Sequence, residues 1–265
     1  MSDLRFTILG CGSSGGVPRL GGIWGECDPD NRKNHRRRCS ILVERTGAGG
    51  TTRVLIDASP DLRAQLLDAG VGELDGVVFT HPHADHCHGI DDLRMVVFNT
   101  RRKLPVWADG PTSDSLTARF GYAFRTPPGS SYPPILDLNL IDGPVEVTGA
   151  GGTVTLTPFP VTHGAITALG FRVGDVAYLP DVSEIGADGW AALGDLDIWI
   201  VDALRRSPHP SHSHLDNTLG WIARAAPRRA VLTNMHVDLD FETVRAETPP
   251  NVEPAFDGMI LSPGE

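Results

Sequence analysis

Short runs of apolar and β-branched residues, separated by turns rich in glycine and proline, predict many short strands with a few helices between them. Strands are expected at residues 4–9, 41–44, 53–57, 76–80, 104–108, 135–141, 145–147, 154–159, 167–173 and 176–179. Apolar residues at helical spacing predict helices at residues 61–69, 88–98, 112–122 and 215–226. Strand clusters in two halves with helices between them favour an α/β protein, two mixed β-sheets sandwiched between helices, in one domain over residues 1–265. Residues 124–134 are rich in proline and glycine and are expected to form an irregular loop, a candidate lid over the functional site.

The segment Thr80 to His86 combines four metal-ligand side chains in an H-x-H-x-D-H pattern at the end of one expected strand. His81 and His83 stand two residues apart, so both leave the strand end on the same side. Asp85 and His86 follow in the turn and swing to a different side. Two imidazoles for one ion, and a carboxylate with a third imidazole for another, predict a site for two metal ions, of a kind that suits zinc or manganese.

Composition limits the classes of partner. The chain has 23 basic and 33 acidic residues and a net charge of −10, which argues against a general nucleic-acid binder. Two basic stretches, residues 32–38 and 101–103, are either solvated faces or a rim that attracts phosphate. The four cysteines show no C-x-x-C spacing, so buried thiols are expected and disulfides are not. No apolar stretch approaches the roughly 20 residues that span a bilayer, and the first residues lack a secretion signal, so a cytoplasmic protein is expected.

A glycine-rich loop, residues 10–19, follows the first expected strand. Its backbone amides are able to cradle a phosphate, although its spacing matches neither the P-loop nor the dinucleotide fingerprint. The alternative role is close passage of the backbone past another loop, because glycine has no side chain and tolerates positive φ.

The H-x-H-x-D-H pattern resembles the metallo-β-lactamase fold superfamily, in which a lone histidine, a bridging aspartate and a last histidine follow downstream. His163 and Asp181, each at the end of an expected strand, fit the first two of these positions. The resemblance implies one metal bound by His81, His83 and His163, a second bound by Asp85, His86 and a final histidine, and Asp181 between the two. It also implies that Asp57 supports the metal loop, although from the residues alone Asp57 could equally cap a helix.

The final ligand departs from the superfamily pattern. Relatives commonly end the strand with Leu-Thr-His, whereas residues 231–236 here read Val-Leu-Thr-Asn-Met-His. His236 is expected to complete the second site, because two residues along a strand lie on the same face, and Asn234 is the alternative.

Within the superfamily, the chain resembles the phosphoribosyl 1,2-cyclic phosphate phosphodiesterase (PhnP-like) family of phosphonate degradation. The similar segments are residues 10–18, 24–27 with the basic run to residue 40, 80–86, Asp181, 211–215 and 256–259. That family also holds a structural zinc, but here Cys27 is the one cysteine in the early loop and Val237 replaces the late histidine, so this zinc is expected to be absent. The resemblance gives His212 a catalytic and substrate-binding role, with His214 one short alignment slip away.

These patterns predict a phosphodiesterase with two divalent metal ions per chain, Zn²⁺ or Mn²⁺, that hydrolyses small or cyclic phosphodiesters such as 5-phosphoribosyl 1,2-cyclic phosphate. A metal-bridging hydroxide would attack phosphorus, with Asp85 and His212 as catalytic residues. The expected partner is a small phosphodiester or nucleotide-like molecule rather than nucleic acid or a membrane, and a homodimer is left open. The alternatives are a tRNA 3′-processing type of nuclease, a lactone or thioester hydrolase, and a non-catalytic member that binds a metal or ligand.

Overall fold

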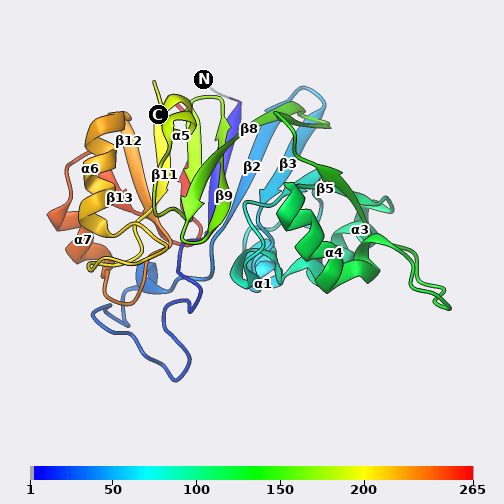
Figure 1. Ribbon diagram of the computed structural model, residues 1–265, viewed down its shortest axis with the longest axis horizontal. Helices are drawn as coiled ribbons and strands as arrows, with labels where there is room; N and C mark the ends of the chain where they lie inside the picture. Colours follow the sequence, from blue (N-terminus) through cyan, green and yellow to red (C-terminus); the bar gives the residue numbers. More distant parts are fainter. Residues whose placement is uncertain (1–2, 265) are drawn as a thin grey trace.

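Two seven-stranded β-sheets face one another across an apolar core in the computed structural model, which describes residues 3–264 of the protein (Figure 1). The first sheet, in spatial order, contains β14 (Ile260–Leu261), β1 (Leu4–Gly10), β2 (Ser40–Gly47), β3 (Gly50–Ile56), β4 (Gly76–Val78), β5 (Leu104–Ala108) and β6 (Leu136–Leu140). The second contains β13 (Val252–Pro254), β12 (Arg229–Thr233), β11 (Ile198–Asp202), β10 (Val176–Leu179), β9 (Ile166–Val173), β8 (Gly152–His163) and β7 (Val145–Gly149).

Both sheets are mixed, as the sequence predicts. In the first sheet β14, β1, β2 and β3 pair antiparallel, and β3 to β6 pair parallel. The second sheet repeats this division, with β7 to β10 antiparallel and β10 to β13 parallel. The helices flank the two sheets, so the αββα sandwich and the α/β class are confirmed.

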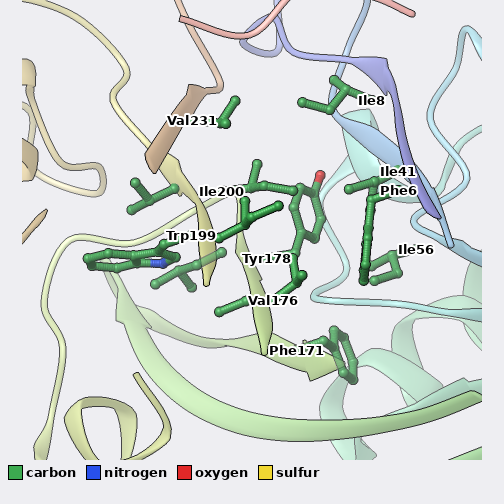
Figure 2. Close-up of a cluster of buried hydrophobic side chains, with 14 of the residues drawn as sticks. Phe6, Ile8, Ile41, Ile56, Phe171, Val176, Tyr178, Trp199, Ile200 and Val231 are labelled. Atoms are coloured by element: carbon green, nitrogen blue, oxygen red, sulfur yellow. The ribbon is translucent and has the colours of Figure 1, made fainter. Parts of the chain in front are cut away.

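The central strands of the first sheet are buried on both faces. In β2, Ile41 and Val43 join the core between the sheets, whereas Leu42 joins a second core under the helices. This follows from the two-residue period of side chains along a strand. Figure 2 shows the core between the sheets, where Phe6 and Ile8 of β1 face Tyr178 of β10.

Seven α-helices of the described residues cover the outer faces of the sheets and connect the strands. They are α1 (Leu62–Asp68), α2 (Ala84–Cys87), α3 (Leu93–Thr100), α4 (Gly110–Phe124), α5 (Ala187–Ala192), α6 (Leu215–Ala225) and α7 (Phe241–Glu247), with short 3₁₀ turns at Arg32–Asn34 and Ile90–Asp92. Helices α1, α3 and α4 cover the first sheet, and α6 and α7 cover the second (Figure 1). Local sequence explains the helix starts, since Asp109 accepts a hydrogen bond from the Thr112 amide and caps α4.

Part of the basic run at residues 32–38 makes contacts inside the fold. Arg36 is buried, and its guanidinium donates to the backbone carbonyls of Leu239 at 2.7 Å and His236 at 3.3 Å. Arg37 pairs with Asp68 and Arg38 with Asp61. Arg36, Arg37 and Arg38 therefore tie the early loop to the rest of the chain, whereas Arg32 and residues 101–103 are exposed.

The early loop packs against the segment after β12 through apolar contacts. Cys27 and Val237 form a small buried cluster with Val17, and Trp24 packs against it. All four cysteines are buried and unpaired.

The loop between α4 and β6 does not act as a lid in this structure. It extends away from the rest of the molecule (Figure 1), and Tyr132 within it is 75% exposed. The cavity at the predicted metal site is lined by other segments. Over residues 3–264, no helix combines the length and the hydropathy needed to cross a membrane.

Candidate metal centre

The predicted metal ligands gather where several strands end at one edge of the two sheets. His81, His83, Asp85 and His86 lie just after β4, in a loop that runs into the single turn of α2. His163 is the last residue of β8, and Asp181 follows β10 by two residues. Ligand sites commonly form at the ends of strands in sheets with parallel strands, because the side chains that leave neighbouring strands meet there.

Three overlapping groups of side chains place their ligand atoms within 4.8 Å of one another. They are His81, His83 and His163; His81, His86 and Asp181; and His163, Asp181 and His212. Asp85 lies beside them, with its Oδ2 3.6 Å from Nε2 of His86. The structure thus brings six of the seven predicted ligands close together, and the group of His81, His83 and His163 is the set that the sequence analysis proposed for the first metal.

Three buried atoms that are able to bind a metal lack a hydrogen-bond partner among the described residues. They are Nε2 of His81, Nε2 of His86 and Oδ2 of Asp181. Nε2 of His86 lies 2.8 Å from Oδ2 of Asp181, but the two atoms do not meet in hydrogen-bond geometry. Unsatisfied buried nitrogen and oxygen atoms are costly unless something binds them. Imidazole nitrogens with a carboxylate oxygen fit zinc or manganese, so these residues fit the divalent metals that the fold implies.

Hydrogen bonds on the opposite ring nitrogen orient the histidines. Nδ1 of His81 bonds to the Thr80 hydroxyl at 2.9 Å, and Nδ1 of His163 donates to the Ser211 carbonyl at 2.6 Å. Nδ1 of His86 donates to Asp57 at 2.7 Å. With Nδ1 protonated and engaged, Nε2 of each ring is left as the metal-binding atom.

Asp57 supports the metal loop and does not cap a helix. Besides His86, it accepts hydrogen bonds from the amide and the hydroxyl of Thr80, both at 2.8 Å. Helix α1 begins five residues later, after Asp61. The residues alone left open whether Asp57 caps a helix or supports the metal loop. In the structure it supports the loop, as the superfamily resemblance implies.

The charge balance of the cluster favours a cation. Burial lowers the pKa of His81 well below its usual range and also lowers that of His163, so both rings are neutral, as metal ligands must be. Burial acts in the same direction on His86, but the charges of Asp181 and Asp57 outweigh it and raise the pKa of His86 well above its usual range. The carboxylates around His86 therefore favour a positive charge at this place. In the protein without metal, a proton on His86 supplies that charge.

Asn234, and not His236, occupies the place next to Asp181. The Asn234 side-chain amide donates to Oδ1 of Asp181 and to Oδ1 of Asp202, both at 3.2 Å. Nδ1 of His236 lies 3.2 Å from Oδ1 of Asp238, and its Nε2 contacts the Arg19 guanidinium. Both ring nitrogens of His236 are thus engaged outside the ligand cluster. The backbone turns at Asn234, where φ is 60°, and this turn directs His236 away from the cluster.

His212 lies next to the cluster on the loop between β11 and α6. Its Nδ1 is 3.0 Å from Oδ2 of Asp202 and 3.2 Å from Oδ1 of Asp181. Burial lowers the pKa of His212, but the hydrogen bond and charge of Asp202, followed by the charge of Asp181, raise it overall. Asp202 is fully buried, and burial raises its pKa to about 6.

A cavity of about 360 Å³ opens over the cluster. His212 and Asn234 line it with Ser13, Ser14, Gly15, Arg19, His83, Asp85, His163, Asp181, Leu204, Arg205, His209, Ser211 and His236. His214, the predicted alternative to His212, does not line this cavity and stands at the start of α6.

Sequence reasoning missed Arg19 and Arg205, which line this cavity, and Asp202, which is buried beneath His212 and Asn234. Asp202 ends a strand in a carboxylate, the same signal that indicated Asp57 and Asp181, so it could have been found. Arg19 ends the glycine-rich loop, whose pattern did not indicate a role for its side chain, and Arg205 stands in a segment with no motif of its own.

The comparisons agree with this geometry. A family model described as a beta-lactamase superfamily domain matches residues 52–235. An octanoyltransferase of Porphyromonas gingivalis is 34% identical over 259 residues, which cover 97% of this chain and 51% of that protein. A ribonuclease Z of Aeropyrum pernix is 35% identical over 118 residues, which cover 44% of this chain and 32% of that protein. The chain thus spans about half, or less, of the length of these two relatives.

Among solved structures, the fold is similar to a crystal structure described as a new diphosphatase from the PhnP family. The TM-score is 0.85 at 32% identity, over 97% of this chain and 96% of that one. The family match covers more than half of the chain and includes the H-x-H-x-D-H segment, His163, Asp181 and Asn234. The chain therefore belongs to the beta-lactamase superfamily and has the metallo-β-lactamase fold, with a structure similar to that of the PhnP-family protein.

Proposed function

We infer that the protein hydrolyses small phosphodiesters with two divalent metal ions, Zn²⁺ or Mn²⁺, held by His81, His83, Asp85, His86, His163 and Asp181. The observation that carries this inference is the convergence of unpartnered Nε2 and carboxylate oxygen atoms beneath a cavity that His212 also lines. Bound metal would supply Lewis acidity that activates a water molecule and neutralises charge on the phosphoryl oxygens. The similarity to a PhnP-family diphosphatase and to ribonuclease Z supports a phosphodiester as the substrate.

His212 acts as the proton donor in this proposal. Its Nδ1 is held by Asp202, so Nε2 is left for the substrate. The two carboxylates beside the ring raise its pKa and keep a proton available near neutral pH. That proton can pass to the alkoxide that leaves when the ester bond breaks.

The dimensions of the cavity favour a small substrate. A volume of about 360 Å³ lies at the lower end of the range for small-molecule sites, roughly 300 to 1,000 Å³. A five-membered cyclic phosphate is compact, and 5-phosphoribosyl 1,2-cyclic phosphate is the specific substrate that we propose.

Turnover of bis(p-nitrophenyl) phosphate and of ribose 1,2-cyclic phosphate, with metal content measured on the same sample, tests the function. We expect hydrolysis of both diesters with about two metal ions per chain. A protein that holds its metals but hydrolyses neither diester would contradict the proposal, and acyl substrates would then be examined.

A pair of variants tests the role of His212. His212→Ala should lower kcat by roughly 10² to 10⁴ with unchanged metal content, because general acid catalysis contributes about that much. His214→Ala is the matched control, since His214 lies outside the cavity two residues away, and it should retain activity. If His212→Ala lost metal instead, His212 would be a ligand through its group with His163 and Asp181.

Processing of tRNA 3′ ends is the second candidate, because of the similarity to ribonuclease Z. A net charge of −10 and the burial of Arg36 within the basic run both count against RNA. Cleavage of a tRNA precursor with a 3′ extension, with an affinity that falls steeply with salt, would favour this candidate over the small diester.

A further inference from the structure

A second cavity, of about 860 Å³, opens on the outer face of the first sheet. It is lined by side chains from β1, β2 and β14, from the end of α1 and from the early loop. None of its lining residues belongs to the ligand cluster or to the cavity over that cluster. Its volume falls within the range of small-molecule sites, roughly 300 to 1,000 Å³. The cavity is therefore large enough for a ligand, and the metal centre does not explain it.

The floor of this cavity follows from the alternation of side chains along β1. Phe6 and Ile8 point into the core between the sheets (Figure 2), so Thr7 and Leu9 lie on the opposite face of the strand. Thr7 and Leu9 line the cavity together with Leu42 of β2. Their exposed fractions are 8%, 3% and 1%. The floor is thus built from side chains that the fold holds in place.

The apolar part of the lining is aliphatic. Val17, Ala69 and Ile260 line the cavity besides the two leucines of the floor, and no phenylalanine, tyrosine or tryptophan is among the lining residues. Ile260 leaves 54% of its surface exposed. An alkyl chain that covered these side chains would remove apolar surface from water. A flat ring would find no aromatic side chain to stack on.

The Thr7 hydroxyl is a polar group without a partner in this floor. It makes no hydrogen bond within residues 3–264, although the residue is more than nine-tenths buried. Buried polar side chains nearly always have a hydrogen-bond partner, and a hydroxyl group donates one hydrogen and accepts two. This hydroxyl is therefore available to an oxygen atom of a molecule in the cavity.

Arginines gather at the rim of the cavity. Four line it, and the guanidinium of one of them, Arg36, donates to backbone carbonyls of the segment after β12. The other three are Arg5, Arg32 and Arg37. The side chain of Arg32 forms neither an ion pair nor a hydrogen bond with any residue that the structure describes. In a chain of net charge −10, this rim is a local concentration of positive charge.

The nearby carboxylates balance these arginines only in part. Glu44 is buried and pairs with both Arg5 and Arg53, so one carboxylate serves two guanidinium groups. Glu44 does not itself line the cavity. Asp68 lines it and pairs with Arg37. One positive charge of the Arg5 and Arg53 pair and that of Arg32 are thus left uncompensated.

Asp257 is the other carboxylate at this cavity. It accepts hydrogen bonds from the backbone amides of Cys11 at 3.2 Å and Arg37 at 2.8 Å. Burial raises the pKa of Asp257 to about 7, so the group carries only part of a negative charge at neutral pH. The rim therefore favours an anion.

We propose that this cavity binds a free aliphatic acid of medium chain length. The carboxylate lies at Arg5 and the Thr7 hydroxyl, which stand two residues apart on one face of β1. The alkyl chain lies on Leu9 and Leu42. The positive rim selects an acid over a neutral molecule, and the aliphatic floor selects an alkyl chain over an aromatic ring. The inference does not rest on the proposed function, because the metal centre takes no part in it.

Titration with three small ligands tests the proposal. Isothermal calorimetry of the protein should give a dissociation constant for decanoate at least about tenfold lower than that for decanol, because a charged hydrogen bond is worth roughly tenfold or more. Acetate, which has the carboxylate without the long chain, should not bind at the same concentrations. Decanoate binding should weaken as salt is added, since the arginines stand at the rim.

Two variants test the contacts of the carboxylate. Arg5→Ala should weaken decanoate binding about tenfold, and Thr7→Val, which keeps the shape but lacks the hydroxyl, about three- to tenfold. Both variants should bind decanol as the wild type does. Arg63→Ala, which removes an exposed arginine on α1 outside the cavity, is the matched control and should keep the wild-type affinity for decanoate.

A third variant fills the cavity. Ala69 is half-buried at the end of α1 and lines the cavity. Ala69→Trp should place an indole where the alkyl chain lies and weaken decanoate binding by more than about tenfold. Ala64→Trp, on α1 but outside the cavity lining, is the matched control and should bind decanoate as the wild type does. Circular dichroism of both variants checks that the fold is retained.

Equal dissociation constants for decanoate and decanol would overturn the proposal, as would wild-type affinity for decanoate in both Arg5→Ala and Ala69→Trp. Binding of the protein to phosphatidylglycerol vesicles, without affinity for free decanoate, would also overturn it, since the ligand would then be a lipid surface. None of these experiments measures diester hydrolysis, so a failure of the proposed function leaves their result unaffected.

Discussion

Oδ2 of Asp57 accepts a hydrogen bond from Nδ1 of His86 at 2.7 Å, and both side chains are fully buried. Asp57 adopts a φ of 66°, in the left-handed region that aspartate and asparagine enter more readily than most residues. The backbone turn after β3 thus aims a carboxylate at the ring, and the ring keeps Nε2 for a metal. In this way Asp57, which does not contact the substrate, fixes the tautomer of the metal ligand His86.

Asp57→Asn tests this relationship. Asparagine retains the backbone conformation, but its amide nitrogen would face the Thr80 hydroxyl and the Nδ1 hydrogen of His86, both of which are donors. We expect His86 to change tautomer and metal affinity to fall by about 10- to 100-fold. Competition with a chelator of known affinity measures this.

Asp61→Asn is the control for that variant. Asp61 lies four residues further along and pairs with Arg38 away from the metal cluster. It should retain wild-type metal affinity. Equal metal affinity in Asp57→Asn and the wild type would show that the hydrogen bond from His86 to Asp57 does not affect metal binding by His86.

Asn234 should be convertible into a metal ligand. It follows β12 with a φ of 60° and lies against Asp181, and histidine is also enriched in that backbone region. Asn234→His would restore the residue that relatives commonly have, and we expect the second metal ion to bind at least about tenfold more tightly. Stepwise metal titration of the variant and the wild type checks this.

His236→Ala distinguishes the two positions that the sequence left open. Because both ring nitrogens of His236 are engaged by Arg19 and Asp238, its removal should leave the metal content unchanged. Loss of one metal ion from His236→Ala would return this histidine to the second site.

Most of the fold and the ligand cluster could be predicted because they are encoded locally. The alternation of Ile41, Leu42 and Val43 marks a strand with two buried faces, and H-x-H-x-D-H places four ligands within six residues. The predicted strands and helices match the observed elements with boundary differences of a few residues.

The positions of His236 and Arg36 could not be predicted, because they depend on the path of the backbone in loops after the strands end. A single left-handed residue at Asn234 turns His236 from the cluster toward Arg19, a residue more than 200 positions away. Arg36 likewise donates to the carbonyls of residues 236 and 239, so one arginine of a run that looks solvated in sequence is buried. Contacts between distant loops leave no local pattern.

Tyr178→Phe should not destabilise the protein. The Tyr178 hydroxyl lies in the core between the sheets, near Phe6 and Ile8 (Figure 2), and has no hydrogen-bond partner among the described residues. Burial raises the pKa of this hydroxyl well above its usual range, so it stays protonated. Removing an unsatisfied buried hydroxyl should leave the free energy of unfolding unchanged or raise it by about 1 kcal/mol.

Urea unfolding of Tyr178→Phe and of Tyr132→Phe provides the measurement. Tyr132 is 75% exposed, so its variant should match the wild type. A loss of more than about 1 kcal/mol in Tyr178→Phe would mean that the hydroxyl is hydrogen-bonded in solution.

Asp240 should make the stability of the protein depend on acid pH. It caps α7 by accepting from the Thr243 amide at 3.0 Å, and it accepts from the Asn34 side chain at 2.6 Å and the Asp28 amide at 3.2 Å. Burial raises the pKa of Asp240, but these hydrogen bonds outweigh it and lower the pKa to about 2. Because the folded pKa lies below the unfolded value, the stabilisation is present above about pH 4 and is lost as the pH falls toward 2.

Asp240→Ala should therefore lower the free energy of unfolding by about 1 to 2 kcal/mol at pH 7, the usual cost of losing such a cap. The difference from wild type should narrow as the pH falls from 4 toward 2, since protonation removes the same charge from the wild type. Urea unfolding at pH 7, 4 and 3 measures it, with the exposed Asp142→Ala as the control that should change little at any pH. A difference that stayed constant from pH 7 to pH 3 would show that the cap acts through its shape and not through the charge of Asp240.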